Sequence, residues 1–524
     1  MIKTGKFHIA LILFIFCTNS ALVAQIEHKT RFEIEYDWRY ENHEVVSNDD
    51  RGLTLIQTNR ETVGRRYKVK FTHLDKELKE IWVDSTQISS KMHLMGYHYL
   101  KDKMFVMFQD YPVKKRIEVL SLDYKTQTIT HHESNQEVEL TLSEFEMIDN
   151  TVLLGGYLDL RPVVYAFDLE NDRVKALRGI YKNNSKLFEV RVNKDSVTFN
   201  VLVGEQNKEK DQTVVVNTYD YEGNQIRDYS LMTKKDYSLL DGVSSSINEI
   251  TQVVVGNYGY KSQTLPSGIY INYVNRVGEQ SINFINYGEL DSFLDYLSDS
   301  RQEKVKAKAE ELKASGKEQR YKLLSLIRAL KEVDGKLIFM AEYFKPGGRN
   351  RVASPGITGT RQGNYTTNSE RDAFGNYVQT PINDFDFTHG YALVLDEQGQ
   401  VLWDDSFTLD YNLENSLDEH GRFQWVDEKK HLVYIHYDDE EVKGRILNDS
   451  LENEVLVADL FIHDDHDKRD ELQSTVRITR WYDDLFLIQG IQNVRVKDKS
   501  EASKKVFFIN AVRIDSGGTP KKMD

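Results

Sequence analysis

The feature that most constrains the fold is a hairpin that recurs along the chain at a spacing near 50 residues. In each copy an apolar strand ends at an aspartate, the chain turns within a few residues, and a second strand returns. The aspartates are Asp75, Asp123, Asp168, Asp220 and Asp396, and the first four lie 48, 45 and 52 residues apart. Units of four strands that repeat at this length are typical of propeller blades. We therefore predict an all-β fold, a β-propeller.

A second kind of hairpin precedes most of these, and its turns give the number of blades. Strands rich in Val, Ile, Phe and Tyr flank turns made of Asn, Asp, Gly or Lys, as hairpins require. The turns fall near Asp49, Asp102, Asn150, Lys194, Asn248, Gly335, Glu428 and Asp483. They predict eight four-stranded blades, or seven if one weak unit is miscounted. The last unit has only three strands, so we expect the N-terminal strand 31–38 to close the ring as its fourth.

Two insertions interrupt the repeat, and they flank the same blade. Residues 289–317 predict a helix, with Ser292 and Asp295 as a capping pattern and Gly316 at its end. Residues 345–388, rich in glycine and proline, predict a long loop. Residues 320–332, which lie between them, fit either a helix or a first strand. Because the strands of a blade alternate in direction, we expect both insertions to rise from one face and to cap that end of the channel.

The first 24 residues have the anatomy of a signal peptide. Lys3 and Lys6 precede the apolar run 9–17, and Ala24 stands before the expected cleavage point. The run is half as long as a membrane span requires. We expect export to the periplasm, with extracellular release as the alternative, and one propeller domain over 25–524. Cys17 is the only cysteine, so the mature chain is expected to have no disulfide and no thiol chemistry.

The net charge of −15, which becomes −17 when Lys3 and Lys6 are removed, bears on partners. An acidic body argues against nucleic acid and against anionic membrane surfaces. No segment after the leader is apolar enough to span a bilayer, so we expect no membrane insertion of the mature chain. We expect a monomer that binds a protein or glycan partner of the cell envelope.

The stretch from Val333 to Trp403 resembles an uncharacterised family of exported propeller-like proteins of Gram-negative bacteria. The shared pattern is Asp-Gly, an apolar strand, Ala-Glu-x-aromatic, a variable loop, and a strand ending Leu-Asp-x-x-Gly with a Trp four residues later. In this chain the pattern occupies Asp334-Gly335, Ala341 to Phe344, Leu395-Asp396, Gly399 and Trp403. The resemblance implies the fold and export, and it implies no catalytic residue.

Few residues point to chemistry. The sequence contains no HExxH, GxSxG, P-loop or EF-hand motif. With 83 acidic residues, no single pair can be identified as a glycosidase acid pair. One dense polar cluster offers imidazole and carboxylate groups to a divalent metal, and its alternative is a solvated loop between the last two blades. The cluster consists of His463, Asp464, Asp465, His466 and Asp467. No other cofactor is expected.

Aromatic and basic residues on two predicted loops are the candidate ligand contacts. Tyrosine on a loop suits glycan or peptide binding because its ring packs while its hydroxyl forms hydrogen bonds. The arginines of the long loop would favour an anionic ligand on this acidic body. The candidates are Tyr258, Tyr260, Arg349, Arg351, Arg361, Tyr365, Arg371, Phe374 and Tyr377.

Three functions fit these observations. The leading hypothesis is a non-enzymatic binding or scaffold protein that contacts its partner through loops on one propeller face. The first alternative is a polysaccharide hydrolase or lyase that gathers acids from several blades. The second alternative is a structural component of the envelope.

Overall fold

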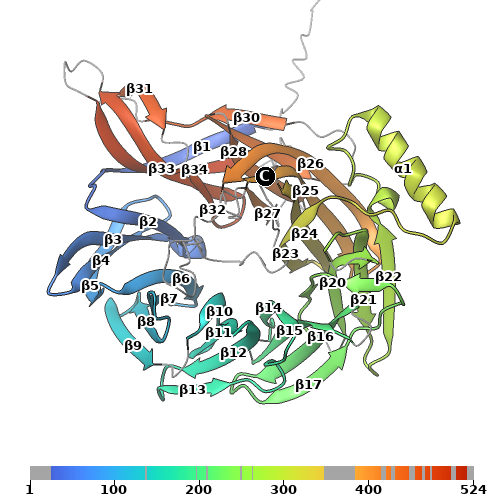
Figure 1. Ribbon diagram of the computed structural model, residues 1–524. Coiled ribbons are helices and arrows are strands. Elements are labelled where there is room, and N and C mark those ends of the chain that lie inside the picture. Colours follow the sequence, from blue (N-terminus) through green and yellow to red (C-terminus); the bar gives the residue numbers. More distant parts are fainter. Residues whose placement is uncertain are drawn as a thin grey trace, which may run out of the picture.

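The strands form eight antiparallel sheets that follow one another around a ring, which makes the chain an eight-bladed β-propeller (Figure 1). The computed structural model describes residues 25–135, 139–195, 197–207, 211–247, 251–261, 264–346, 384–414, 421–426, 431–438, 440–447, 455–462, 466–471, 475–496 and 503–515. The prediction of eight blades rather than seven is confirmed.

Each blade is numbered from the N-terminus, and its strands are given from the channel outwards. Blade 1 consists of β2 (Tyr40–Ser47), β3 (Leu53–Val63), β4 (Arg66–Leu74) and β5 (Glu80–Ser89), with the short η1 (Asp49–Arg51) after β2. Blade 2 consists of β6 (Met92–Leu100), β7 (Lys103–Asp110), β8 (Arg116–Asp123) and β9 (Thr128–Asn135). Blade 3 consists of β10 (Thr141–Ile148), β11 (Thr151–Leu158), β12 (Arg161–Asp168) and β13 (Arg173–Ala176). Blade 4 consists of β14 (Ser185–Val192), β15 (Thr198–Gln206), β16 (Gln212–Asp220) and β17 (Gln225–Ser230).

The second half of the ring carries the elaborations. Blade 5 has a split inner strand, β18 (Tyr237–Leu239) and β19 (Val243–Ser244), followed by β20 (Gln252–Tyr260), β21 (Gly268–Val274) and β22 (Gln280–Asn286). The connection to blade 6 contains η2 (Tyr287–Glu289) and α1 (Asp299–Ala314). Blade 6 consists of β23 (Leu324–Val333), β24 (Lys336–Pro346), β25 (Asp384–Asp396) and β26 (Val401–Glu414). Blade 7 consists of β27 (Arg422–Val426), β28 (His431–Asp438), β29 (Glu441–Leu447) and β30 (Val455–Asp459). Blade 8 consists of β31 (His466–Glu471), β32 (Arg477–Arg480), β33 (Leu485–Val496), β34 (Lys504–Asp515) and β1 (Gln25–Glu35).

The ring closes as predicted, because the N-terminal strand completes the last blade. β1 pairs antiparallel with β34 from Gln25 opposite Asp515 to Glu35 opposite Val506. The strand begins earlier than the predicted 31–38 and ends before Trp38, which lies in the turn toward blade 1. Because β1 leads directly into blade 1 but pairs in the sheet of blade 8, it ties the first and last blades together.

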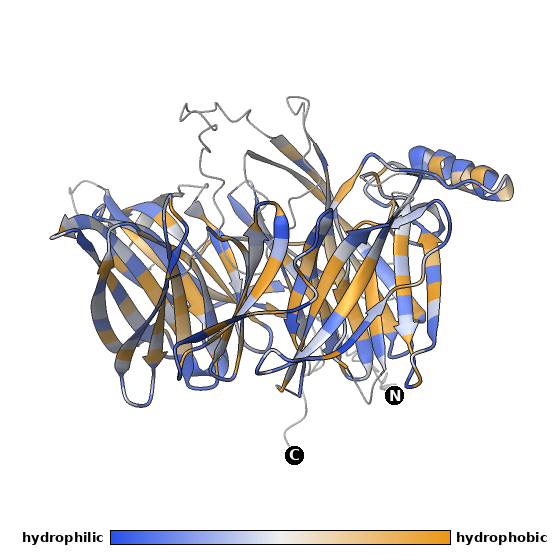
Figure 2. Ribbon diagram, turned by 60° about the horizontal axis from the view of Figure 1, so that its bottom comes forward, coloured by the Kyte–Doolittle hydropathy of each residue, from blue (hydrophilic) through white to orange (hydrophobic). Residues whose placement is uncertain are grey.

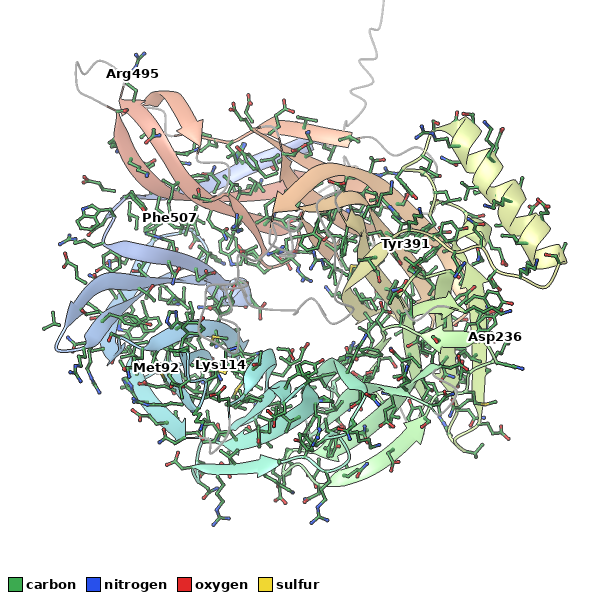
Figure 3. All side chains as sticks on the ribbon, viewed as in Figure 1. Met92, Lys114, Asp236, Tyr391, Arg495 and Phe507 are labelled. Carbon is green, nitrogen blue, oxygen red and sulfur yellow. The ribbon has the colours of Figure 1, made fainter. Side chains whose placement is uncertain are left out.

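The hydrophobic core lies in the spaces between blades, where side chains of neighbouring sheets interleave (Figure 3). The middle strands of a blade are covered on both faces, so they are apolar at nearly every position. Strand β7, for example, is buried from Met104 to Gln109. The outer strands are covered on one face, so half-buried and exposed residues alternate along β22 from Gln280 to Phe284. No helix in the described part of the chain is long and apolar enough to cross a membrane.

The repeated aspartates close the outer hairpin of their blades. In each case a side-chain oxygen accepts hydrogen bonds from backbone N–H groups two to four residues further on, which fixes the turn. This bonding is made by Asp75, Asp123, Asp168, Asp220 and Asp396, and in blade 5 by Asn275. The spacing that predicted the fold is therefore the spacing of one turn-closing residue per blade.

Strand direction divides the connections between two faces. The turns from first to second and from third to fourth strand lie on one face, which we call the hairpin face. The turns from second to third strand, and the links from one blade to the next, lie on the other. The α1 connection and the strand ends that flank residues 347–383 belong to this second group, as predicted, so we call it the insertion face; α1 stands on it in Figure 2.

The structure corrects two predicted boundaries and decides between the two alternatives for a third segment. The helix begins at Asp299 after the N-cap residue Ser298, not at Ser292, because residues 290–294 pack into the core instead. Of the segment 320–332, which fitted either a helix or a first strand, residues 324–332 belong to β23, the inner strand of blade 6, so the strand alternative is confirmed. The predicted loop 345–388 is shorter than expected, because β24 continues to Pro346 and β25 already starts at Asp384.

Candidate functional site

The best-defined candidate site is the base of the insertions, on the insertion face of blades 5 and 6. The chain leaving η2 is bound to the outer strand of blade 6 before α1 begins. The backbone N–H of Ser292 donates to a carboxylate oxygen of Asp404 at 2.9 Å, and the hydroxyl of Ser406 donates to the Ser292 carbonyl at 2.6 Å. Three apolar side chains of the segment are buried beside these bonds, Leu290, Phe293 and Leu294.

The chain leaving α1 is bound to blade 5 through Glu318. Its carboxylate accepts hydrogen bonds from the hydroxyl groups of Tyr237 and Tyr258, at 2.9 and 3.1 Å, and from the amide of Asn286 at 2.8 Å. Burial and the neighbouring Glu318 raise the pKa of both tyrosines, so the hydroxyls stay protonated as donors. The helix is thus fixed at both ends, although Ala309 is the only buried residue within it.

A histidine lies at the centre of an aromatic stack under this insertion. The ring of His389 is parallel to Tyr296 of the α1 connection on one side, at 4.4 Å, and to Tyr343 of β24 on the other, at 5.0 Å. Phe293 meets it edge-on at 4.7 Å. Its Nδ1 lies 2.9 Å from the Thr388 hydroxyl, and its Nε2 is buried without a hydrogen-bond partner. Burial lowers the pKa of His389 to about 3, so the ring is neutral at physiological pH.

Next to the stack, a buried polar network fills the gap in the inner strand of blade 5. Asp241, between β18 and β19, accepts hydrogen bonds from the backbone N–H of Asn257 at 2.6 Å, from its amide, and from the Ser325 hydroxyl. The Asn257 side-chain oxygen accepts from Tyr287 at 2.6 Å and from Tyr343 at 3.0 Å. Burial raises the pKa of Asp241. The network joins the α1 connection to both blades.

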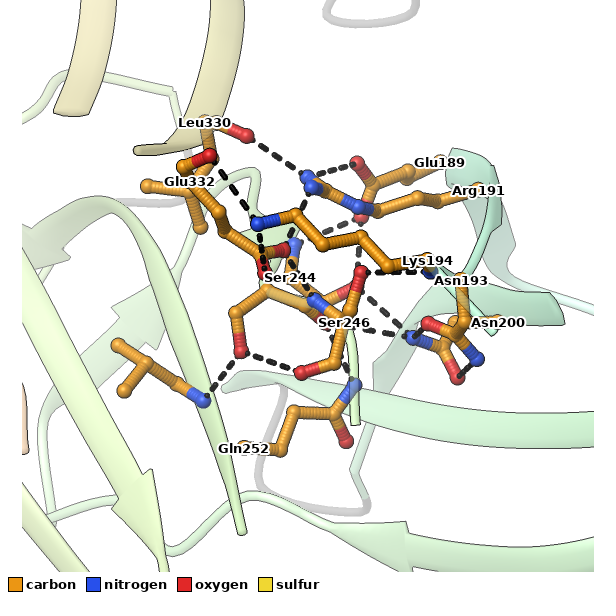
Figure 4. Close-up of polar contacts among 12 residues, drawn as sticks. Glu189, Arg191, Asn193, Lys194, Asn200, Ser244, Ser246, Gln252, Leu330 and Glu332 are labelled. Atoms are coloured by element: carbon orange, nitrogen blue, oxygen red, sulfur yellow. Dashed lines mark hydrogen bonds and ion pairs between the residues drawn. The ribbon is translucent and has the colours of Figure 1, made fainter. Parts of the chain in front are cut away.

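A second cluster joins the inner strands of blades 4, 5 and 6 near the hairpin face (Figure 4). The guanidinium of Arg191 donates to the Leu330 carbonyl at 2.9 Å and forms an ion pair with Glu332 at 2.8 Å. Glu332 also accepts from the backbone N–H of Ser246, and Lys194 lies 3.2 Å away. Burial alone would raise the pKa of Glu332, but Arg191, Ser246 and Lys194 hold it below its usual value.

These contacts identify the second cluster as a brace. Arg191 and Lys194 reach across the short strand β19 to blade 6, and Glu189 of blade 4 binds the backbone N–H and hydroxyl of Ser244 in between, at 2.7 and 3.0 Å (Figure 4). The groups bind one another, so none is presented to a ligand as a free acid or base. The brace compensates for the split inner strand of blade 5.

The structure corrects the predicted loop position of Tyr258. The second strand of blade 5 runs on to Tyr260, so Tyr258 lies within β20 and is fully buried, stacked on Tyr237 at 5.4 Å. Its ring lies over Gly268, where a Cβ would come within 2.7 Å of it. Tyr260, at the strand end, is half-buried and lies under Lys261.

The remaining predicted contacts are not described structurally. Arg349, Arg351, Arg361, Tyr365, Arg371, Phe374 and Tyr377 lie outside the described residues. Of the predicted metal ligands, His463, Asp464 and Asp465 lie outside them, and His466 and Asp467 are described only as backbone of β31. Within the described ranges no group of three or more His, Cys, Asp or Glu side chains is placed to hold a metal ion.

Sequence reasoning missed the residues that organise the base. His389 and Asn257 each interrupt an otherwise apolar strand, in THGYALVL and VVVGNYGY, and a polar residue at a fully buried strand position is the signal that would have identified them. Glu318 carries no such signal, because it lies among lysines after a polar helix. Only the fold brings it to Tyr237.

Comparisons with known proteins agree with the fold and go no further. No family model matches the chain, and no curated protein matches it. Among solved structures it is similar to a europium-containing methanol dehydrogenase, at 9% identity over 92% of this chain and 93% of that chain, with a TM-score of 0.44. It is similar to the polysaccharide lyase Uly1, at 9% identity over 81% and 90%, with a TM-score of 0.37. It is also similar to the β-propeller domain of the Trilobed protease from Pyrococcus furiosus, at 9% identity over 79% and 97%, with a TM-score of 0.34.

Proposed function

We propose that this propeller is an exported binding or scaffold protein whose insertion face, over blades 5 and 6, contacts a protein or glycan of the cell envelope. The observation that carries the proposal is the shared position of the two insertions. The α1 connection and the strand ends that flank residues 347–383 lie on one face of adjacent blades, and the α1 connection is bound at each end by part-buried hydrogen bonds. Loops on a rigid scaffold are where propellers place recognition.

The hydrogen bonding of two partly buried acids supports binding over catalysis at the base of the α1 connection. Asp241 accepts hydrogen bonds from Asn257 and Ser325, and Glu318 accepts three from fixed donors. A general acid or base must be able to exchange a proton with a substrate. The oxygens of these carboxylates instead accept hydrogen bonds from the protein itself, so their role is to hold the α1 connection in place.

The test is to replace residues 347–383 by a short Gly-Ser linker, which leaves β24 and β25 intact. Wild type, this variant and a matched control, Lys182→Met on blade 4, are each used to capture partners from cell-envelope extract. We expect specific partners of the wild type and control to be absent with the linker variant. Identical partners for all three proteins would contradict the proposal.

A glycan screen separates this proposal from the enzymatic alternative. Purified mature protein is incubated with a panel of envelope and extracellular polysaccharides, and new reducing ends or unsaturated products are measured. We expect binding without product formation. Turnover that is lost when one acid is neutralised would replace the proposal with a hydrolase or lyase.

A further inference from the structure

The insertion face over blades 1 to 4 exposes apolar side chains at the tips of its turns, away from the two insertions. Leu160 is 91% exposed, Val63 is 75% exposed and Trp38, on the link into blade 1, is 66% exposed. Among the described residues the full set is Trp38, Val63, Tyr111, Val113, Leu160, Tyr181 and Met232. In the described turns of the hairpin face the exposed large apolar residues are fewer, namely Val197, Tyr221 and Val277.

Cations stand directly beside these apolar tips. Arg65 and Arg66 follow Val63, and Lys114 and Lys115 follow Val113. Among the described residues, those that form no ion pair on this half of the face are Arg65, Arg66, Lys91, Lys114, Lys115, Arg161, Arg178, Lys234 and Lys235. The combination of an apolar tip and a neighbouring cation therefore recurs on four successive blades.

The acids of the same turns are fewer, and several are already engaged. Asp37 pairs with Arg39 at 2.6 Å, and Asp236 lies 3.7 Å from Lys261. Asp110 accepts hydrogen bonds from the backbone N–H groups of Lys115 and Arg116 at 2.8 and 2.6 Å. This half of the insertion face is thus locally cationic, although the protein is acidic.

The hairpin face is the opposite in charge. Its turns carry the turn-closing aspartates and many further exposed acids, among them Asp49, Asp50, Glu77, Asp149, Glu170, Asp172, Glu222, Glu279, Asp334 and Glu397. Several of its cations are neutralised by ion pairs, as Lys101 is by Asp149 and Lys194 is by Glu332. The negative net charge is therefore concentrated on one face, and the molecule is electrostatically polar across its thickness.

Leu160 shows that the apolar tips are not favoured by the fold itself. It stands at the tip of the β11–β12 turn with φ +65°, a left-handed conformation that is costly for an L-residue and suits Gly, Asn or Asp. A leucine here buries nothing and strains the backbone. Such a residue is retained where a contact outside the chain uses it.

We propose that the insertion face of blades 1 to 4 docks on an anionic lipid surface. Separate apolar tips, each beside a cation, can enter a fluid interface independently, while the cations meet acidic headgroups. A rigid protein partner would need a matching pocket for each tip. The acidic hairpin face would be repelled by the same surface, which orients the molecule. The described taller elements, α1 and the long strands of blade 6, stand on the other half of the ring (Figures 1 and 2).

The experiment measures binding of the mature protein, residues 25–524, to sedimented vesicles of phosphatidylcholine alone or mixed equally with phosphatidylglycerol. A tip variant carries Val63→Ser, Val113→Ser and Leu160→Ser, and a charge variant carries Arg65→Gln, Arg66→Gln, Lys114→Gln and Lys115→Gln. The matched control on the hairpin face carries Val197→Ser, Val277→Ser, Lys76→Gln and Lys79→Gln. Thermal melting of each protein verifies that it is folded.

We expect the wild type and the control to bind the anionic vesicles, with weaker binding at high salt, and each face variant to bind at least about tenfold more weakly. The fluorescence of the wild type should shift to the blue on binding, and Trp38→Phe should abolish most of the shift. A variant with residues 347–383 replaced should still bind vesicles, which separates this proposal from the proposed function.

Three results would overturn the proposal. They are equal binding to neutral vesicles, equal loss in the hairpin-face control, and no vesicle binding by the wild type. Retention on polyglutamate without vesicle binding would assign the surface to an acidic protein instead.

Discussion

The middle strands of blades 3 and 6 have the same topology and the same position within their blades, but they bury side chains of different chemistry. In β11 and β12 the buried positions are aliphatic or glycine for most of their length, as in Val152, Leu154 and Val164. In β24 and β25 the fully buried positions include Glu342 and His389 as well as Tyr343. Blade 6 also pairs Glu342 with the buried Arg328 of its inner strand, at 2.8 Å.

The difference shows that the propeller plan does not require buried polar groups, since blade 3 folds with few. Desolvating a charge or an imidazole costs free energy that an aliphatic residue avoids. Blade 6 nevertheless concentrates such groups beneath the α1 connection, whose segment 290–296 packs on them. Buried polar groups that the fold does not require are typical of functional or specificity-determining regions.

The largest expected effect comes from breaking the buried pair of blade 6. Arg328→Met leaves the Glu342 carboxylate buried without its cation, and we expect a loss of about 3–5 kcal/mol in the free energy of unfolding, measured by urea denaturation. Lys182→Met, which breaks an exposed pair with Glu205 in blade 4, should cost about 0–1 kcal/mol. Equal effects of the two substitutions would show that the Arg328–Glu342 pair of blade 6 contributes no more than an exposed ion pair.

Acidification should weaken blade 6 through His389. The folded pKa is about 3 and the ordinary value is 6.5, so below pH 6.5 the unfolded chain binds a proton that the folded chain refuses. Stability due to this group is therefore complete above pH 6.5 and falls, by up to about 1.4 kcal/mol per pH unit, as the pH drops toward 3. Denaturation at pH 7.5 and 5.5 should show a smaller difference for His389→Gln than for the wild type. The exposed His93→Gln serves as control and should leave the difference unchanged.

The outer turns should respond alike in both blades, because they use one device. Asp168 of blade 3 and Asp396 of blade 6 each accept two backbone hydrogen bonds within the turn. We expect Asp168→Ala and Asp396→Ala to cost about 1 kcal/mol each in thermal or urea unfolding. Replacement by Asn should recover most of the loss, as Asn275 serves in blade 5. A much larger loss of stability from one of the two substitutions would show that the two turns do not contribute equally.

The smallest expected effect is a gain. Leu160→Asn in blade 3 places a residue that tolerates the left-handed region at φ +65°, and we expect about 0.5–1 kcal/mol of added stability in the same assay. No comparable gain is expected from Val63→Asn, because Val63 is not among the residues of positive φ. Destabilisation by Leu160→Asn would show that the leucine contributes to the fold after all.

The repeat predicted the fold because each blade needs the same local chemistry. Asp75, Asp123, Asp168 and Asp220 mark a turn that only a few residue types can close, so their spacing revealed the blades before any tertiary contact was known. Closure by the N-terminal strand followed from counting strands. The helix start was wrong because Leu290, Phe293 and Leu294 are taken by the core, a tertiary preference that local capping patterns do not contain.

The candidate site was harder to predict, because its groups are separated along the chain. Tyr258 reads as a loop residue beside Gly259 and Lys261, but the neighbouring blades bury it. His389 lies between two tyrosines that precede it by 46 and 93 residues. Contacts of this range depend on how the blades are placed, and local patterns do not encode that placement.

By itself, the sequence determined the repeat, the turn chemistry, a blade number of eight or seven and the ring closure, all of which rest on local propensity and periodicity. It also determined the net charge of −15, which argued against anionic surfaces. Only the tertiary structure decided where that charge lies. Strand alternation sends the acidic hairpin turns to one face and the apolar, cationic turns to the other. A partner meets one face at short range, and salt screens the charges of the far face. The net charge of the whole chain therefore does not describe the charge of either face.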